Sequence, residues 1–545
     1  MAVTSRPPGW RLAALTAAAV ALAGAVSASA KPTPPPTLSP VIVQAGSTAA
    51  ARTAVQTVIT LAGNVGKITA DLPLVNGVVA NLTTAEIGQL TSYVVTPDAT
   101  VLTAGKPKPS PTPTTPPRQL DNVFPDVTGA RALASAGNSG QGIGVAVLDT
   151  GIAPLADFSG RLRTGVDLSG EGNAQLDSYG HGTFVAGLVA GNGASSNGTY
   201  VGEAPGATLV PVKVAGKSGS TTLSTVIRGL DWIRTNTTDN IRVINMSIGA
   251  IPTTSTAVNP LDQAVETMWR TGFVIVTSAG NNGSNAGTIT SPGDDPLVIT
   301  VGALDDKDTT STADDAVPSF SSHGPTAWDG WYKPDLIAPG KSVVSVTSTT
   351  SVIWNANSSA RVGTKNFVGS GTSFATALTS GAAAMLLHEN PLATPDNVKA
   401  ALLTTTNAGP SPPQSPFVQG HGVLDVGKAV AEPLISINQD VSSIVPPVAL
   451  GLPISLLSRQ VVSTWATVNP SEQLLYPALY PFPYSGPATT ATDGGSPLFQ
   501  SSAWNSSAWN SSAWNSSAWN SSAWNSSAWN SSAWNSSAWN SSAWN

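Results

Sequence analysis

Short apolar runs alternate with longer runs of helical pattern between about residue 121 and residue 430, and this alternation constrains the fold. Strand-length and helix-length segments in alternation are typical of a parallel sheet covered by helices on both faces. We therefore expect an α/β domain over residues 121–430. The expected strands are 143–149, 208–214, 242–247, 273–278 and 297–302, and the expected helices are 181–190, 222–234, 260–270, 372–388 and 395–404.

Three reactive side chains stand beside glycines at junctions of this pattern. Asp149 ends an apolar strand, whereas His181 and Ser373 each stand where a helix is expected to begin. In α/β sheets these junctions line the crevice in which ligands bind. An acid, a base and a nucleophile are the groups that acyl transfer at neutral pH requires.

The order Asp, His, Ser and the sequences around these residues resemble those of the subtilisin-like serine proteases, the subtilases. The resemblance covers roughly residues 121–428, and weakly the segment before them. It implies that Ser373 is the nucleophile, that His181 is the general base and then the general acid, and that Asp149 orients His181. The segments that carry it are Val147-Leu148-Asp149-Thr150-Gly151-Ile152, Gly180-His181-Gly182-Thr183 and Gly371-Thr372-Ser373-Phe374-Ala375.

Taken singly, two of these residues have other interpretations. Ser373 would also suit a helix N-cap. The Asp-Thr-Gly at Asp149 is also the signature of aspartic proteases, which need two such carboxylates. The chain has no second Asp-Thr-Gly or Asp-Ser-Gly, so that interpretation would require a homodimer. The three motifs together favour the serine protease.

The same resemblance implies the remaining parts of a protease site. Asn281 follows an apolar run and would donate its amide to the oxyanion hole, although a turn asparagine would also fit there. Three residues at 247–249 would pair with an extended peptide, and three others would form a pocket for small or medium apolar side chains. The residues implied to bind substrate are Ser247, Ile248, Gly249, Ala279, Gly280 and Thr290.

The first 120 residues divide into four segments. Residues 1–30 have a positive start, an apolar run shorter than the roughly 20 residues of a membrane span, and an Ala-Ser-Ala end, which predicts a signal peptide and secretion. Residues 31–40 form a Pro-rich spacer and residues 106–120 a Pro-rich linker. Between them, residues 41–105 read as a βαββαβ unit. This order resembles the ferredoxin-like inhibitory prodomain of subtilases, although an unrelated α+β module would also fit.

The C-terminal part has low complexity. Residues 431–500 read as a Pro-rich linker, and residues 501–545 are nine copies of Ser-Ser-Ala-Trp-Asn. A five-residue period matches neither a helix nor a strand, so the indoles cannot share one face of either. We expect a low-complexity tail that is either passive or adhesive toward a cell wall or glycan. A β-solenoid is a less suitable alternative, because an indole is large for its interior.

Composition narrows the class of function further. The chain has no cysteine, which rules out disulfides, a thiolate nucleophile and Cys-ligated metals. A formal net charge of −6 without basic clusters argues against nucleic acid as a partner. The chemistry requires no cofactor, but calcium stays open, with Asp167, Asp177 and the loop 192–202 as candidate ligands.

We therefore predict a secreted, monomeric serine endopeptidase that cuts proteins or peptides and is made as a zymogen, with its own prodomain as inhibitor. The alternative is a catalytically silent protein that binds a cell wall or glycan through the tryptophan repeat.

Overall fold

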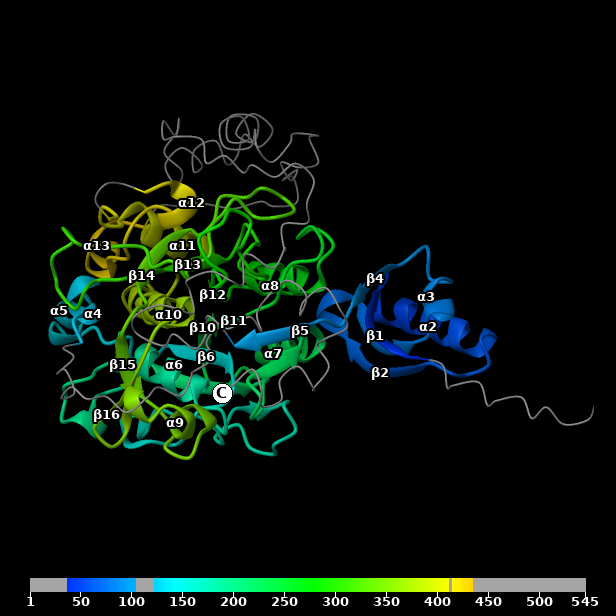
Figure 1. The fold of residues 1–545 in the computed structure, drawn as a ribbon, viewed down its shortest axis with the longest axis horizontal. Coiled ribbons are helices and arrows are strands. Elements are labelled where there is room, and N and C mark those ends of the chain that lie inside the picture. Colours follow the sequence, from blue (N-terminus) through cyan, green and yellow to red (C-terminus); the bar gives the residue numbers. More distant parts are fainter. Residues whose placement is uncertain (1–36, 104–121, 411–413, 435–545) are drawn as a thin grey trace, which may run out of the picture.

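The computed structural model describes residues 37–103, 122–410 and 414–434 (Figure 1). The predicted signal peptide, the linker 106–120, the repeat tail and nearly all of segment 431–500 lie outside these residues. No helix in the described part of the chain is long and apolar enough to cross a membrane.

A seven-stranded sheet forms the centre of the larger domain, and all its neighbouring strands are parallel. Every residue of its central strand β6 is buried, as expected for a sheet that is covered on both faces. The strands, in spatial order, are β14 (Leu336–Pro339), β13 (Ile299–Leu304), β12 (Val274–Ser278), β10 (Ile241–Met246), β6 (Gly144–Asp149), β8 (Thr208–Lys213) and β7 (Val166–Asp167).

Helices cover both faces of this sheet (Figure 1). The pair α6 (His181–Ala190) and α10 (Thr372–Glu389) packs on one face, and the pair α7 (Leu223–Thr235) and α8 (Pro260–Arg270) packs on the other. Almost all of α10 is buried, because its small side chains let neighbouring elements approach from every side. The remaining helices of this domain are α4 (Phe124–Val127), α5 (Ala130–Ser135), α9 (Val352–Ala356), α11 (Pro395–Thr404), α12 (Pro416–Gln419), α13 (Val426–Ala431) and the 3-10 turns η2 (Ala156–Phe158), η3 (Ala194–Ser196) and η4 (Ser358–Ala360).

The expected α/β fold is confirmed, and the five predicted strands and five predicted helices form within two residues of their predicted bounds. The sequence analysis missed β7 and β14. It also missed a small antiparallel sheet of β15 (Val343–Val346), β17 (Asn366–Gly369) and β16 (Arg361–Val362). This small sheet packs against α6, where the Ser345 hydroxyl donates to the Phe184 carbonyl at 2.8 Å.

The N-terminal unit has its own antiparallel sheet and its own small core. The spatial order is β2 (Lys67–Leu72), β3 (Gly77–Leu82), β1 (Ser39–Gln44) and β4 (Val94–Pro97), and β2 and β3 form a hairpin through the 3-10 turn η1 (Pro73–Val75). The apolar side of α2 (Thr48–Leu61) packs on this sheet. A capping box between Thr83 and Glu86 opens α3 (Thr84–Ile87).

One strand of the N-terminal segment leaves its own sheet. The strand β5 (Thr100–Thr103) lies between β11 (Ile248–Gly249) and β9 (Ser220–Thr222) of the larger domain and is antiparallel to both. Figure 1 shows β5 reaching from the N-terminal unit to the middle of the larger domain. The sequence analysis placed these residues at the end of the N-terminal unit without a strand.

Candidate active site

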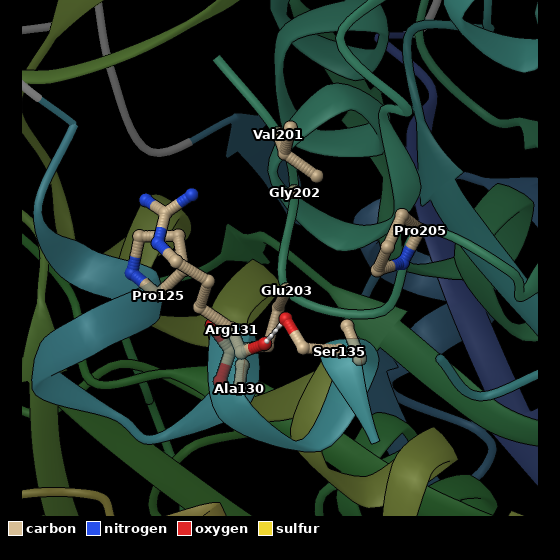
Figure 2. A pocket seen from close by; sticks show the side chains of 9 residues that line it. Pro125, Ala130, Arg131, Ser135, Val201, Gly202, Glu203 and Pro205 are labelled. Atoms are coloured by element: carbon tan, nitrogen blue, oxygen red, sulfur yellow. Dashed lines mark hydrogen bonds between the residues drawn. The ribbon is translucent and has the colours of Figure 1, made fainter. Parts of the chain in front are cut away.

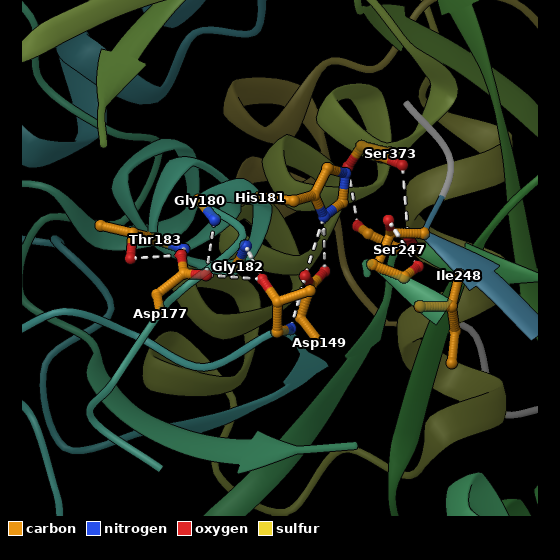
Figure 3. Close-up of polar contacts among 12 residues, drawn as sticks. Asp149, Asp177, Gly180, His181, Gly182, Thr183, Ser247, Ile248 and Ser373 are labelled. Atoms are coloured by element: carbon orange, nitrogen blue, oxygen red, sulfur yellow. Dashed lines mark hydrogen bonds and ion pairs between the residues drawn. The ribbon is translucent and has the colours of Figure 1, made fainter. Parts of the chain in front are cut away.

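Asp149 and His181 form a buried pair at the carboxyl edge of the sheet. Asp149 ends β6 and His181 begins α6, so the backbone of two buried elements fixes both. The His181 Nδ1 atom lies 2.8 Å from Asp149 Oδ1 and 2.9 Å from Oδ2 (Figure 3). The Thr150 N–H donates to Asp149 Oδ1 at 2.7 Å. This arrangement places the proton of the imidazole on Nδ1, because a carboxylate can only accept.

Ser373 lies in the first turn of α10, and Figure 3 shows it beside His181. The ring centroids of His181 and Phe374 are 5.9 Å apart, which places the start of this helix against the imidazole. Two hydrogen bonds tie Ser373 to Ser247: the Ser247 hydroxyl donates to the Ser373 carbonyl at 2.8 Å, and the Ser373 hydroxyl donates to the Ser247 carbonyl at 3.2 Å. The helix N-terminus favours negative charge at this place.

The orientation of the Asn281 amide follows from its neighbour Thr372. The Thr372 N–H donates to Asn281 Oδ1 at 2.9 Å and the Thr372 hydroxyl donates to the same oxygen at 3.0 Å. The Thr372 hydroxyl is in turn held by the Gly280 N–H at 3.3 Å. Since both donors take the oxygen, the Nδ2 group of Asn281 must point to the other side. The amide of Asn281 and the start of α10 are thus held as one unit.

Ile248 and Gly249, which are predicted to bind an extended peptide, form β11, one edge of the three-stranded sheet with β5 at its centre. Ile248 pairs with Thr103 and Gly249 pairs with Leu102, while the β9 side pairs with residues 100–102. Val101 is fully buried in this position. An extended backbone therefore occupies the groove between β9 and β11 in this structure.

Thr290 lies across the predicted side-chain pocket. A Cβ added to Gly249 would lie 2.5 Å from Thr290 Oγ1, and one added to Gly280 would lie 2.8 Å from Thr290 Cγ2. The backbone of Thr290 is anchored by a 3.0 Å bond from its N–H to the Ala279 carbonyl. Both glycines thus lie directly against the threonine side chain.

Two residues near the site were not assigned to it from the sequence. Tyr179 stands two residues before His181, and its ring packs on Gly219. Its hydroxyl hydrogen-bonds to the Thr103 side chain, and burial raises the pKa of Tyr179. The buried carboxylate of Asp177 bonds to the segments on both sides of the Asp149–His181 pair. No sequence signal except closeness to the Gly-His-Gly-Thr segment points to either residue.

The candidate calcium ligands have protein partners. Asp177 accepts from Thr183, and Asp167 accepts from the Ser169 hydroxyl at 2.7 Å. In loop 192–202, Ser195 donates to the buried Asp157. Among the described residues, no three His, Cys, Asp or Glu side chains are arranged to hold a metal ion. The structural calcium therefore stays a prediction without a located site.

A cavity of about 290 Å³ lies between α5 and segment 201–205 (Figure 2). Its lining includes Arg131 and the fully buried Glu203, and burial raises the pKa of Glu203 to about 8. None of the residues that line it is a predicted site residue. The cavity is therefore separate from the candidate active site.

The arrangement of sheet and helices is the subtilisin-like α/β fold. The solved structure of fervidolysin from Fervidobacterium pennivorans, described as a keratinolytic enzyme related to subtilisin, shares it with a TM-score of 0.57. The match has 23% sequence identity and covers 74% of this chain and 62% of that one, so it shows the fold alone.

A profile described as "Subtilase family" matches residues 140–422, about half of the chain. The chain therefore belongs to the subtilase family, the family of subtilisin-like serine proteases. It is 43% identical over 298 residues to serine protease AprX of Bacillus subtilis (strain 168), which covers 54% of this chain and 67% of AprX. It is 39% identical over 266 residues to an extracellular serine proteinase of a Thermus strain, covering 49% of this chain and 55% of that protein. With subtilisin DY of Bacillus licheniformis it shares 35% identity over 304 residues, 55% of this chain and 95% of that protein.

Proposed function

We propose that this protein is a secreted serine endopeptidase that is made as an inactive precursor and matures by cutting its own chain. The observation that carries the proposal is the buried Asp149–His181 pair beside the helix that begins with Ser373. Membership of the subtilase family and the similarity to a relative named as extracellular support it.

In the proposed reaction, Ser373 Oγ attacks the carbonyl carbon of the substrate and His181 Nε2 takes the hydroxyl proton. Asp149 steadies the imidazolium through Nδ1. The Asn281 amide and the Ser373 N–H donate to the oxyanion of the tetrahedral intermediate. His181 then gives its proton to the leaving amine, which leaves an acyl-enzyme. A water molecule, activated by the same imidazole, hydrolyses this ester and restores the Ser373 hydroxyl.

The position of β5 supports the precursor part of the proposal. It pairs with the residues that we propose to hold a substrate, and this antiparallel pairing with β11 is the way an extended peptide binds a sheet edge. We propose that the bond cut in maturation lies shortly after Thr103, where β5 ends.

Two further contacts hold the N-terminal unit on the enzyme. The Asp98 carboxylate accepts from the Ser224 N–H at 2.8 Å and from the Ser224 hydroxyl at 2.7 Å, in the first turn of α7. The Gln44 amide donates to Gln263 of α8 at 2.6 Å. After cleavage these contacts would keep the N-terminal unit bound as an inhibitor.

The test is to express the full chain with and without Ser373→Ala and to map the N-termini and masses of the products. We expect the wild type to be cut shortly after Thr103 and to be labelled on Ser373 by a fluorophosphonate probe, and we expect the variant to stay intact and unlabelled. A variant that matures at the same rate in a purified system would contradict self-processing. A folded wild type that the probe does not label would favour the silent wall-binding alternative.

A further inference from the structure

The Asp177 carboxylate lies at the centre of a buried hydrogen-bond network next to the Asp149–His181 pair. Asp177 is 1% exposed and lies in the loop that leads into α6. Its Oδ1 accepts from the Thr150 hydroxyl at 2.8 Å and from the Gly180 N–H at 2.7 Å. Its Oδ2 accepts from the Thr183 hydroxyl at 2.6 Å and from the Thr183 N–H at 2.8 Å. Figure 3 shows Asp177 beside Gly180 and Thr183.

The partners of Asp177 come from the two segments that carry the catalytic acid and base. Thr150 directly follows Asp149, whereas Gly180 directly precedes His181. The two segments also touch directly: a Cβ on Gly182 would lie 2.2 Å from the Gly151 carbonyl oxygen. One carboxylate therefore fixes how the end of β6 and the start of α6 lie relative to each other.

The directions of the hydroxyl hydrogens follow from the other bonds of the two threonines. The Thr150 oxygen accepts the Gly182 N–H at 2.9 Å, and the Thr183 oxygen accepts the Ala153 N–H at 2.9 Å. Each hydroxyl is thereby set to donate its own hydrogen to Asp177. All four of these partners are donors, so a proton on Asp177 would have no acceptor among them. Burial raises the pKa of Asp177, and these four hydrogen bonds oppose that rise.

We infer that Asp177 is a positioning residue of the protease: as a carboxylate, it sets the distance and angle between Asp149 and His181 and adds a negative charge next to this pair. This inference rests on the proposed function. Asp177 acts through Thr150 and Thr183 and touches no substrate.

Other charged and titratable groups around the network are Asp149 itself, Tyr179, and Lys213 with its partner Glu171. Lys213 Nζ donates to the Thr150 carbonyl at 2.5 Å and lies 3.1 Å from Glu171 Oε2. Tyr179 experiences the charges of both Asp149 and Asp177. The positive charge of Lys213 is paired with Glu171 rather than with Asp177.

The test uses Asp177→Asn in the full chain, with the maturation rate, kcat, KM and the pH profile of kcat/KM as readouts. An asparagine has one acceptor oxygen instead of two, so one pair of donors loses its partner and the acid and base segments shift. Small misplacements of catalytic groups cost about 10²-fold in rate. We expect kcat per active site, counted by complete fluorophosphonate labelling, to fall by about this factor with a smaller change in KM. The acidic limb of the profile should move to lower pH, because the imidazolium loses a neighbouring negative charge.

Asp157→Asn is the matched control, because Asp157 is equally buried, accepts from Ser195, and lies outside the network. It should lower the unfolding temperature and leave kcat per active site and the pH profile unchanged. If Asp177→Asn does not fold, the variants Thr183→Val and Thr183→Ser test the positioning role instead. The valine removes one donor to Asp177 and should lower kcat, while the serine keeps the hydroxyl and should restore it.

The outcomes separate this inference from the proposed function. A wild type that neither matures nor reacts with the probe would contradict the proposed function. An active wild type with unchanged kcat and pH profile in Asp177→Asn would overturn the positioning role alone. An equal fall in kcat for Asp157→Asn would also overturn it, since the loss would then be a general effect of buried carboxylates.

Discussion

Replacing Asp98 by alanine tests whether the N-terminal unit is held on the enzyme by the contact with α7. The substitution removes both hydrogen bonds to Ser224, which are 2.8 and 2.7 Å long and involve a carboxylate. It also removes a negative charge from the N-terminus of a helix of 13 residues. Hydrogen bonds to charged groups contribute about 1.5–3 kcal/mol each. Because both bonds end on one residue at the edge of the contact between the N-terminal unit and the enzyme, we take about 2–3 kcal/mol for the two together. Since 1.4 kcal/mol is a factor of ten, the Kd of the cleaved N-terminal unit should rise about 30- to 150-fold.

The assay measures inhibition of the mature enzyme by its released N-terminal unit, together with the lag before activity appears. Asp98→Asn keeps an acceptor without the charge and should give an intermediate Kd. Ser224→Ala removes one of the two donors and serves as the partner in a double-mutant cycle, in which the double variant should lose less than the sum of the single ones. An unchanged Kd and an unchanged lag in Asp98→Ala would refute the argument that this contact holds the unit in place.

Three further predictions concern the site and its support. Asn281→Ala should lower kcat by about 10²–10³ with little change in KM, measured by peptide hydrolysis, because one oxyanion donor is lost; an equal rise in KM would contradict this. Thr290→Gly should extend the predicted side-chain pocket and shift the preferred residue before the cut from small to large apolar side chains in a profiled peptide library. Burial alone would raise the pKa of Asp335, but the nearby Lys333 and Lys399 lower this pKa below its ordinary value. The ionised Asp335 therefore stabilises the fold fully above the unfolded pKa of about 3.9. This stabilisation is lost as the pH falls through the lower folded pKa. Asp335→Asn should therefore destabilise the protein by about 3–5 kcal/mol at pH 7 in chemical unfolding, because two buried lysines lose their partner.

Elements with strong local signals could be predicted from the sequence. The helix Pro260–Arg270 follows Asn259, whose side chain caps it, and begins with proline at its first turn. The helix Pro395–Thr404 has a capping box at Thr394. In both helices the predicted and observed bounds agree, because the end signals lie within the segment itself. The same holds for Asp149, His181 and Ser373, whose neighbouring glycines marked the junctions at which they lie.

Elements that depend on distant partners could not be predicted in this way. The strand β5 has only four residues, and it forms because β9 and β11, more than a hundred residues later in the chain, lie on either side of it. Likewise β14 has four residues, and its place is set by pairing with β13. The bonds of Asp177 span up to 27 residues and join separate segments. Its burial and its partners appear only in the folded chain, which is why the sequence analysis considered it as a calcium ligand.

Under the proposed function, the three-stranded arrangement of β11, β5 and β9 also limits what the enzyme can cut. A polypeptide in the place of β5 must run straight for at least four residues and must offer backbone hydrogen bonds along both its edges. Helices and the inner strands of a folded sheet have already used those groups. Binding of a substrate therefore depends first on free backbone groups and only then on its side chains. Intact globular proteins should survive at temperatures where their loosened or denatured forms are degraded.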